Sequence, residues 1–141
     1  MPVEDDAGLR NILTSVRTIA TVGVSSNPAK PSYGIFQYLI GAGFRMFPVN
    51  PTVSEIMGRP SYPDVSSIPE KIDLVQVFRK PEDVPAVVED AIRAGAKVIW
   101  MQEDIINEQA AARAEQAGLQ VVMDRCMMKT HQRLIGRRSR L

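Results

Sequence analysis

The stretch IATVGVSSNPAKPSYG, residues 19–34, decides the fold class of this chain. It opens on a short β-branched run over residues 19–24, which is typical of a buried parallel strand. A loop with two prolines follows, and its Asn27-Pro28 pair argues against a helix there. Ser32 then suits the N-cap of a helix with an apolar face between residues 35 and 40. Strand, loop and helix in this order begin an α/β sheet.

The alternation of apolar runs and helical patterns continues along the chain. Four further apolar runs predict strands at residues 44–49, 73–78, 98–101 and 119–123. Helical patterns occupy residues 9–16, residues 81–92 after Pro81, and residues 107–117 after the N-cap Asn107. Residues 53–57 predict a single helical turn, and residues 62–69 a connection with little regular structure. The pattern predicts an α/β, single-domain, doubly wound Rossmann-like fold with a mostly parallel five-stranded sheet.

Composition fixes the class of protein around this fold. The chain has 141 residues, which predicts one domain over residues 1–141 with a core from about residue 13 to residue 131. One cysteine and one histidine exclude an internal disulfide, a multi-cysteine zinc site and a histidine-rich metal site, so no metal is expected. No apolar run reaches the ~20 residues of a membrane span, and residues 1–10 lack a signal-peptide core. We expect a cytoplasmic protein without membrane contact.

The formal net charge of +1 hides a basic C-terminal tail at residues 129–141. This tail contains no acidic residue, and its bases are Lys129, Arg133, Arg137, Arg138 and Arg140. Binding of single-stranded nucleic acid by stacking would need aromatic side chains between these basic residues, and the tail has none there. We therefore expect a solvated, frayed terminus rather than a nucleic-acid contact. A homodimer stays open, because nothing in the spacing decides the oligomeric state.

The residues just after each strand are the candidate ligand contacts, because α/β sheets bind ligands outside the carboxyl ends of their strands. The first such turn departs from the dinucleotide fingerprint, since Ser25 stands where the second glycine of G-x-G-x-x-G is expected. The loop instead carries Lys30 toward a helix N-terminus, which favours a phosphate group. The second strand ends in Asn50 and lacks the acid that binds the ribose of NAD. These features favour a phosphorylated ligand other than NAD.

Several ordered blocks resemble the small stand-alone CoA-binding proteins. That family is similar in fold to the CoA-binding N-terminal domain of the succinyl-CoA synthetase α subunit. The resemblance runs from about Leu13 to His131. Its matching blocks are residues 21–28, 30–34, 48–51, 73–79, 95–102 and 122–126.

The resemblance implies that coenzyme A, or an acyl-CoA, lies in the crevice across the first two strands. Residues 23–26 would approach the pyrophosphate, Lys30 would meet phosphate charge, and residues 50–51 would border the adenosine. Residues 78–80 would line the other side of the crevice, and residues 101–102 the pantetheine arm. The implied CoA contacts are Gly23, Ser25, Ser26, Lys30, Ser32, Tyr33, Asn50, Pro51, Phe78, Arg79, Lys80, Met101 and Gln102.

The expected role is a binding or sensing module without ligase activity. The synthetase carries a phosphohistidine domain and a nucleotide-binding part that this sequence lacks, and no G-x-x-x-x-G-K-[ST] loop occurs. We assign no catalytic residue. Cys126 is a candidate for thiol exchange with CoA as a mixed disulfide, although a single cysteine is more often simply buried.

Two alternatives of other classes stay open. One is a small acyl-CoA-handling enzyme, or a subunit of one, that uses Asp124 or Cys126. The other is an NAD(H)-binding redox regulator, which Asn50 and the absence of a helix-turn-helix segment weaken.

Overall fold

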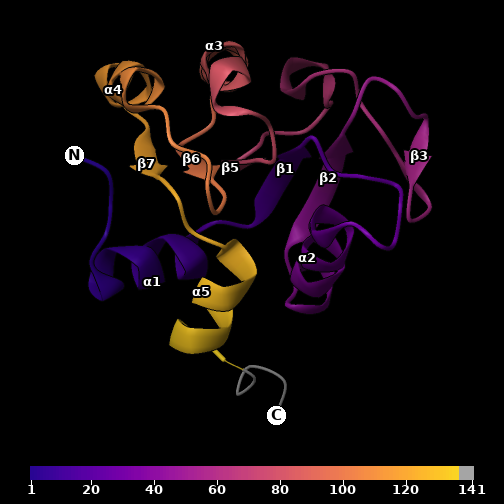
Figure 1. The fold of residues 1–141 in the computed structure, drawn as a ribbon, viewed down its shortest axis with the longest axis horizontal. Coiled ribbons are helices and arrows are strands. Elements are labelled where there is room, and N and C mark those ends of the chain that lie inside the picture. Colours follow the sequence, from indigo (N-terminus) through magenta and orange to yellow (C-terminus); the bar gives the residue numbers. More distant parts are fainter. Residues whose placement is uncertain (137–141) are drawn as a thin grey trace.

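The computed structural model describes residues 1–136 (Figure 1). The helices are α1 (Asp6–Ser15), α2 (Pro31–Gly41), α3 (Val84–Arg93), α4 (Glu108–Gln116) and α5 (Met127–Leu134). The strands are β1 (Thr18–Val22), β2 (Arg45–Val49), β3 (Glu55–Ile56), β4 (Arg59–Pro60), β5 (Leu74–Val77), β6 (Val98–Met101) and β7 (Gln120–Val122). Two 3-10 turns, Val65–Ser67 and Pro81–Asp83, lie in the connections around β5.

Five strands form one parallel sheet in the order β2-β1-β5-β6-β7. The register pairs Ile19 of β1 with Met46 of β2 on one side and with Leu74 of β5 on the other. The chain first builds outward from β1 to β2 and then returns to build on the opposite side of β1. The strand order therefore reverses between β1 and β5, and such a switch point is where ligands of open α/β sheets bind. The predicted α/β, Rossmann-like fold is confirmed.

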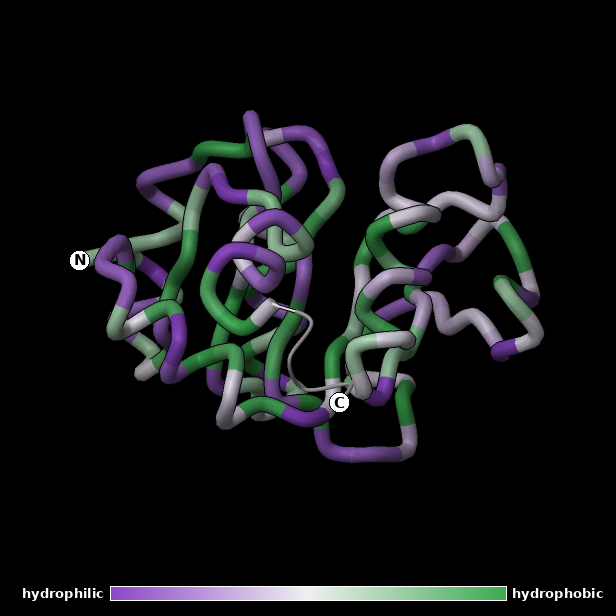
Figure 2. Tube along the Cα trace, turned by 90° about the horizontal axis from the view of Figure 1, so that it is seen from below, coloured by the Kyte–Doolittle hydropathy of each residue, from purple (hydrophilic) through white to green (hydrophobic). Residues whose placement is uncertain are grey.

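Helices cover both faces of the sheet. Helices α3 and α4 pack together on one face, and α5 packs against α1 and α2 on the other (Figure 1). Successive residues of β1 point to opposite faces, so that Ile19 joins one apolar cluster and Ala20 the other. Hydropathy follows this layering, with apolar segments in the strands and polar ones in the outer loops (Figure 2). None of the helices in residues 1–136 is long and apolar enough to cross a membrane.

The predicted N-cap residue is right for helix α4 and wrong for helix α2. Asn107 is the N-cap of α4, as expected, and its Oδ1 accepts a hydrogen bond from Ala110 N at 3.0 Å. The prediction that Ser32 caps α2 is wrong, because Lys30 is the N-cap residue and Ser32 lies inside the first turn. Pro31 explains this shift, since its fixed φ and missing N–H suit the first helical position.

Two predicted segments have a different structure. Residues 53–57 do not form a helical turn but belong to a small antiparallel hairpin, in which β3 pairs with β4. Met57 and Gly58 make its turn, with φ angles of 52° and 75°. The first strand ends at Val22 rather than at residue 24. It ends there because Gly23 takes a φ of 88°, which leaves the extended conformation.

Helix α5 is a further element that sequence patterning missed. The expectation of a frayed terminus from residue 129 is wrong up to Leu134. Arg133 Nη1 lies 3.0 Å from Asp6 Oδ1 of α1, and the hydroxyl of Tyr38 in α2 lies 2.7 Å from His131 Nδ1. The basic residues drew attention away from the apolar side of the helix, where Met127 and Leu134 pack against α1 and α2. Arg137, Arg138 and Arg140 lie outside the described residues.

Candidate functional site

The end of β1 is pressed against the end of β5 at the switch point. A Cβ atom on Gly23 would lie 2.3 Å from the carbonyl oxygen of Phe78 and 2.9 Å from Arg79 Cδ. Gly23 N also donates to Val49 O of β2 at 2.9 Å. The glycine therefore lets three strand ends meet, and its φ of 88° suits glycine best.

The loop from Gly23 to Lys30 is held by its own polar groups. Ser25 N donates to Ser32 Oγ at 2.9 Å, and Asn27 N donates to Ser25 Oγ at 3.0 Å. Ala29 N donates to Asn27 Oδ1 at 2.9 Å. The hydroxyl oxygens of Ser25 and Ser32 thus shape the loop, although Ser25 is one of the residues implied to approach the pyrophosphate. Residues 26–30 are exposed around this framework.

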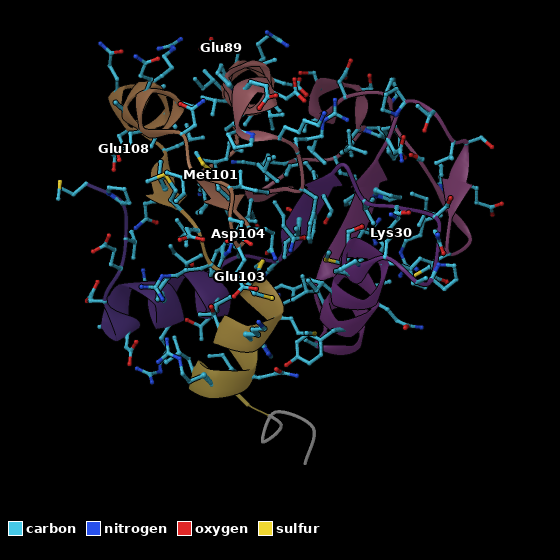
Figure 3. All side chains as sticks on the ribbon, viewed as in Figure 1. Lys30, Glu89, Met101, Glu103, Asp104 and Glu108 are labelled. Carbon is cyan, nitrogen blue, oxygen red and sulfur yellow. The ribbon has the colours of Figure 1, made fainter. Side chains whose placement is uncertain are left out.

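The N-terminus of α2 meets this loop without a side-chain cap. Lys30 is the N-cap residue and makes no capping hydrogen bond with its side chain. The first turn of a helix leaves N–H groups without intrahelical partners, and the helix dipole adds partial positive charge there. The exposed ammonium of Lys30 adds a full charge at the same end (Figure 3). This combination favours an anionic ligand group.

Asn50 joins the first loop to the end of β2. Its Nδ2 donates to Val24 O at 3.0 Å, while its Oδ1 accepts from Thr52 N at 2.9 Å and from Thr52 Oγ1 at 2.7 Å. All the polar atoms of this carboxamide are therefore engaged in the protein. Asn50 thus connects the loop after β1 to the loop after β2. Its side chain is an amide, so it does not supply the carboxylate that would bind the hydroxyls of a ribose.

A cavity of about 290 Å³ opens beside these strand ends on the α3 face. Pro51 and Arg79, two of the predicted residues, line it together with an apolar floor of Val22, Val49 and Val87. Its rim also carries charged residues that sequence reasoning missed, namely Asp64, Asp83, Asp90 and Arg93.

Asp90 is the buried member of that rim. It is 8% exposed, and its carboxylate accepts hydrogen bonds from Val65 N at 2.7 Å and Ser66 N at 3.2 Å. The carboxylate thereby fixes the 3-10 turn before β5. This role of Asp90 could not be predicted from sequence, because Asp90 lies within a helical pattern and the residues that it bonds are 24 and 25 positions away.

A larger cavity, about 720 Å³, lies along the outer edge of β2, lined by Arg45, Arg59, Tyr62 and Glu70 among others. It includes none of the predicted contacts. We place the candidate site at the carboxyl ends instead, because the switch point and the uncapped helix both lie there.

The predicted residues on the other strands are buried. Met101 has no exposed surface, and Gln102 and Cys126 are 3% and 5% exposed (Figure 3 labels Met101). The structure thus divides the predicted contacts into two groups. We call residues 23–33, 50–51 and 78–80 the open half of the carboxyl edge, and residues 101–102 with 124–127 the closed half.

The closed half also contains the two residues considered for chemistry. Asp124 has a φ of 58°, and its Oδ1 accepts a hydrogen bond from Asp104 N at 2.7 Å. Cys126 is a free, buried cysteine at the N-cap of α5. Lys129 lies 3.1 Å from Glu103 Oε1, and this partner raises the pKa of Lys129. Within residues 1–136, no group of three or more acidic, cysteine or histidine side chains could hold a metal ion.

Comparison with known proteins decides the family. Residues 17–132 match the model of the CoA binding domain. The chain belongs to the CoA-binding domain family. The match includes every predicted site residue, from Gly23 to Cys126, in both halves of the carboxyl edge.

Stand-alone relatives span nearly the whole chain. An uncharacterised protein of Bacillus subtilis, YneT, is 34% identical over 125 residues, which cover 89% of this chain and 93% of the relative. A solved structure of a hypothetical protein from Pyrococcus horikoshii is 42% identical, with a TM-score of 0.92 and coverage of 96% and 97%. Both relatives thus align with this chain over nearly their whole length.

The family also includes parts of larger enzymes. An ADP-forming acetate–CoA ligase of Archaeoglobus fulgidus is 28% identical over 121 residues. The aligned region covers 79% of this chain but 18% of the ligase. The similarity to succinyl-CoA synthetase-like enzymes that the sequence indicated is thus confirmed for one domain of such enzymes.

Proposed function

We propose that this domain binds coenzyme A, or an acyl-CoA, at the carboxyl ends of its strands, as a binding or sensing module. The observation that carries the proposal is the match to the CoA binding domain over residues 17–132. The geometry of the open half supports it: a braced loop, an uncapped helix N-terminus and Lys30 offer positive potential to phosphate groups. CoA carries a pyrophosphate and a 3′-phosphate, and both are anions of the kind that such a terminus favours.

The cavity on the α3 face suits the base of the ligand. Its floor of valines and its two prolines offer apolar contact to a flat ring, and Arg79 can stack on such a ring. The carboxylates on the rim can accept hydrogen bonds from an exocyclic amine. Adenine is a flat ring with apolar faces and one exocyclic amine at its edge, which matches this chemistry.

The end of β2 argues against NAD as the ligand. The amide of Asn50 stands where a ribose-binding carboxylate is expected, and its hydrogen bonds to Val24 and Thr52 already engage it. The closed half likewise gives the enzymatic alternative little support. The carboxylate of Asp124 shapes a turn, and the thiol of Cys126 is almost fully buried, which would also restrict thiol exchange.

A titration of the full chain by calorimetry, with thermal unfolding alongside, tests the proposal. The ligands are CoA, acetyl-CoA, dephospho-CoA, NADH and ATP. A ligand at 100 times its Kd should stabilise the fold by about 2.7 kcal/mol, which is a rise of several degrees in Tm. We expect CoA to bind, and dephospho-CoA to bind more weakly because it lacks one phosphate. Binding of NADH without binding of CoA would overturn the proposal.

A further inference from the structure

Three buried polar side chains run in a row across the sheet, toward the carboxyl ends of its strands. Thr21 on β1, Gln76 on β5 and Gln102 just after β6 are 0%, 0% and 3% exposed. Thr21 Oγ1 lies 2.8 Å from Gln76 Oε1, and Gln76 Nε2 lies 3.0 Å from Gln102 Oε1. Burying polar groups is unfavourable unless they are hydrogen-bonded, and these groups bond to one another.

A single backbone group sets the direction of the whole row. The N–H of Met127, at the start of α5, lies 3.0 Å from the side chain of Gln102. A backbone N–H can only donate, so the atom that it meets must be the oxygen of Gln102. That oxygen then also accepts from Gln76, which must present its nitrogen. Gln76 consequently presents its oxygen to Thr21, whose hydroxyl must donate.

This order leaves one donor without a partner at the end of the row. Gln102 Nε2 donates to no atom among residues 1–136. In that same range, every fully enclosed side-chain nitrogen or oxygen has a partner. Gln102 Nε2 therefore is not fully enclosed, and the small exposed surface of Gln102 includes this amide.

We propose that Gln102 Nε2 donates a hydrogen bond to a carbonyl oxygen on the arm of the bound ligand. The inference rests on the proposed function, in which the ligand is CoA or an acyl-CoA. The pantetheine arm of CoA carries amide carbonyls, and an acyl-CoA adds a thioester carbonyl. Both are neutral acceptors that suit an uncharged amide donor. Gln102 is then the residue that contacts the arm of the ligand. Thr21 and Gln76 are positioning residues, because they keep Oε1 of Gln102 engaged in the row and leave Nε2 available to the ligand.

The decisive variant is Gln102→Glu, measured by calorimetry with three ligands. A glutamate retains an oxygen that can accept from Met127 and Gln76, but it replaces the outward donor by an acceptor. We expect the affinity for CoA to fall by about tenfold or more, which is the loss of one hydrogen bond plus repulsion. Adenosine 3′,5′-bisphosphate lacks the arm, so its affinity should not change. The control Glu103→Gln changes the next, exposed side chain and should leave both affinities unchanged.

Acetyl-CoA distinguishes the two sources of the carbonyl. Equal losses for CoA and acetyl-CoA indicate an amide carbonyl of the arm, whereas a loss confined to acetyl-CoA indicates the thioester. Equal losses for CoA and the bisphosphate, or no loss for any ligand, would overturn the role of Gln102. A wild-type protein that binds neither CoA nor the bisphosphate instead contradicts the proposed function itself.

The positioning role has a separate test that spares Gln102. Thr21→Val removes the hydroxyl that fixes Gln76 and should weaken CoA several-fold without affecting the bisphosphate, whereas Thr21→Ser should restore the affinity for CoA. NMR of the wild-type chain needs no variant. The side-chain amide signal of Gln102 should shift on addition of CoA but not of the bisphosphate. A signal that responds to neither ligand, or equally to both, contradicts the inference even if the variants fail to fold.

Discussion

The open and closed halves of the carboxyl edge differ in how their polar groups are held and in how far these groups are exposed to water. In the open half, polar groups of residues 25–33 are organised by short-range hydrogen bonds, and the charge of Lys30 remains in solvent. In the closed half, Gln102 is buried and is hydrogen-bonded across several strands to Gln76, which in turn bonds Thr21, whereas Asp124 remains exposed. The exposed charge of Lys30 suits the anionic part of a ligand, whereas the buried, uncharged amide of Gln102 suits a neutral arm. The difference predicts that the two halves can be impaired separately.

The largest expected effect concerns the glycine on which the open half is built. Gly23→Ala should lower the free energy of unfolding by about 3 kcal/mol, because the new Cβ meets Phe78 O and the φ of 88° is strained for alanine. Urea denaturation measures the loss. Gly43→Ala is the matched control, since Gly43 has a φ of 100° but open space around it. Equal losses in the two variants would show that close packing at the switch point contributes nothing.

The brace at Asn50 should come next. Asn50→Ala removes the hydrogen bonds to Val24 and Thr52, and we expect a loss of about 2 kcal/mol in urea denaturation. Asn11→Ala, at an exposed position in α1, should change the stability little. A stable Asn50→Ala protein with unchanged CoA affinity would remove Asn50 from the account of the site.

A smaller effect is expected from the charge of the open half. Lys30→Gln should weaken CoA binding by roughly tenfold, and the loss should shrink as salt rises, because the lysine acts through an exposed charge. Calorimetry at two salt concentrations measures both. Lys97→Gln removes an exposed lysine just before β6, at the opposite edge of the sheet, and should leave CoA affinity unchanged. If both variants bind alike, the anionic part of the ligand does not lie at α2.

The smallest effect belongs to an ion pair that lies in neither half. Arg45 lowers the pKa of the Glu70 carboxyl through a direct hydrogen bond. A carboxyl with a lowered folded pKa stabilises the fold above its unfolded value of about 4.5, and this contribution disappears as the pH falls through the folded pKa. Glu70→Gln should therefore slightly lower Tm at neutral pH, and the difference should disappear at a pH below the lowered pKa, where the Glu70 carboxyl is neutral in the folded and in the unfolded chain. Thermal scans across this range measure it, and an altered CoA affinity would contradict the placement of the site.

The open half was predictable from sequence because its signals are local. A glycine after a β-branched run, a proline at a helix start and an asparagine after the second strand lie within short stretches of chain. Ser32 shows the limit of this reasoning, since its hydroxyl bonds Ser25 N inside the loop rather than capping the helix. The family resemblance, and not the spacing, supplied the identity of the ligand.

The buried row of Thr21, Gln76 and Gln102 was harder to predict because its contacts join distant parts of the chain. Thr21 and Gln76 are 55 residues apart, and Gln76 and Gln102 are 26 apart. A glutamine at the end of a strand looks like an ordinary surface residue until the sheet order and helix α5 are known. Helix α5 was overlooked because basic residues dominate its sequence pattern. Its apolar residues, which pack on α1 and α2, are interspersed among them.

One measurement tests the central claim most directly: a titration of the isotope-labelled chain with CoA, followed by NMR of its backbone amides. We predict shifts concentrated at residues 23–33, at Asn50, at residues 78–80 and at the side-chain amide of Gln102, with little change along the outer edge of β2. Shifts that instead concentrate around Arg45, Arg59 and Tyr62, or an absence of shifts at saturating CoA, would contradict the assignment of the carboxyl edge as the CoA site.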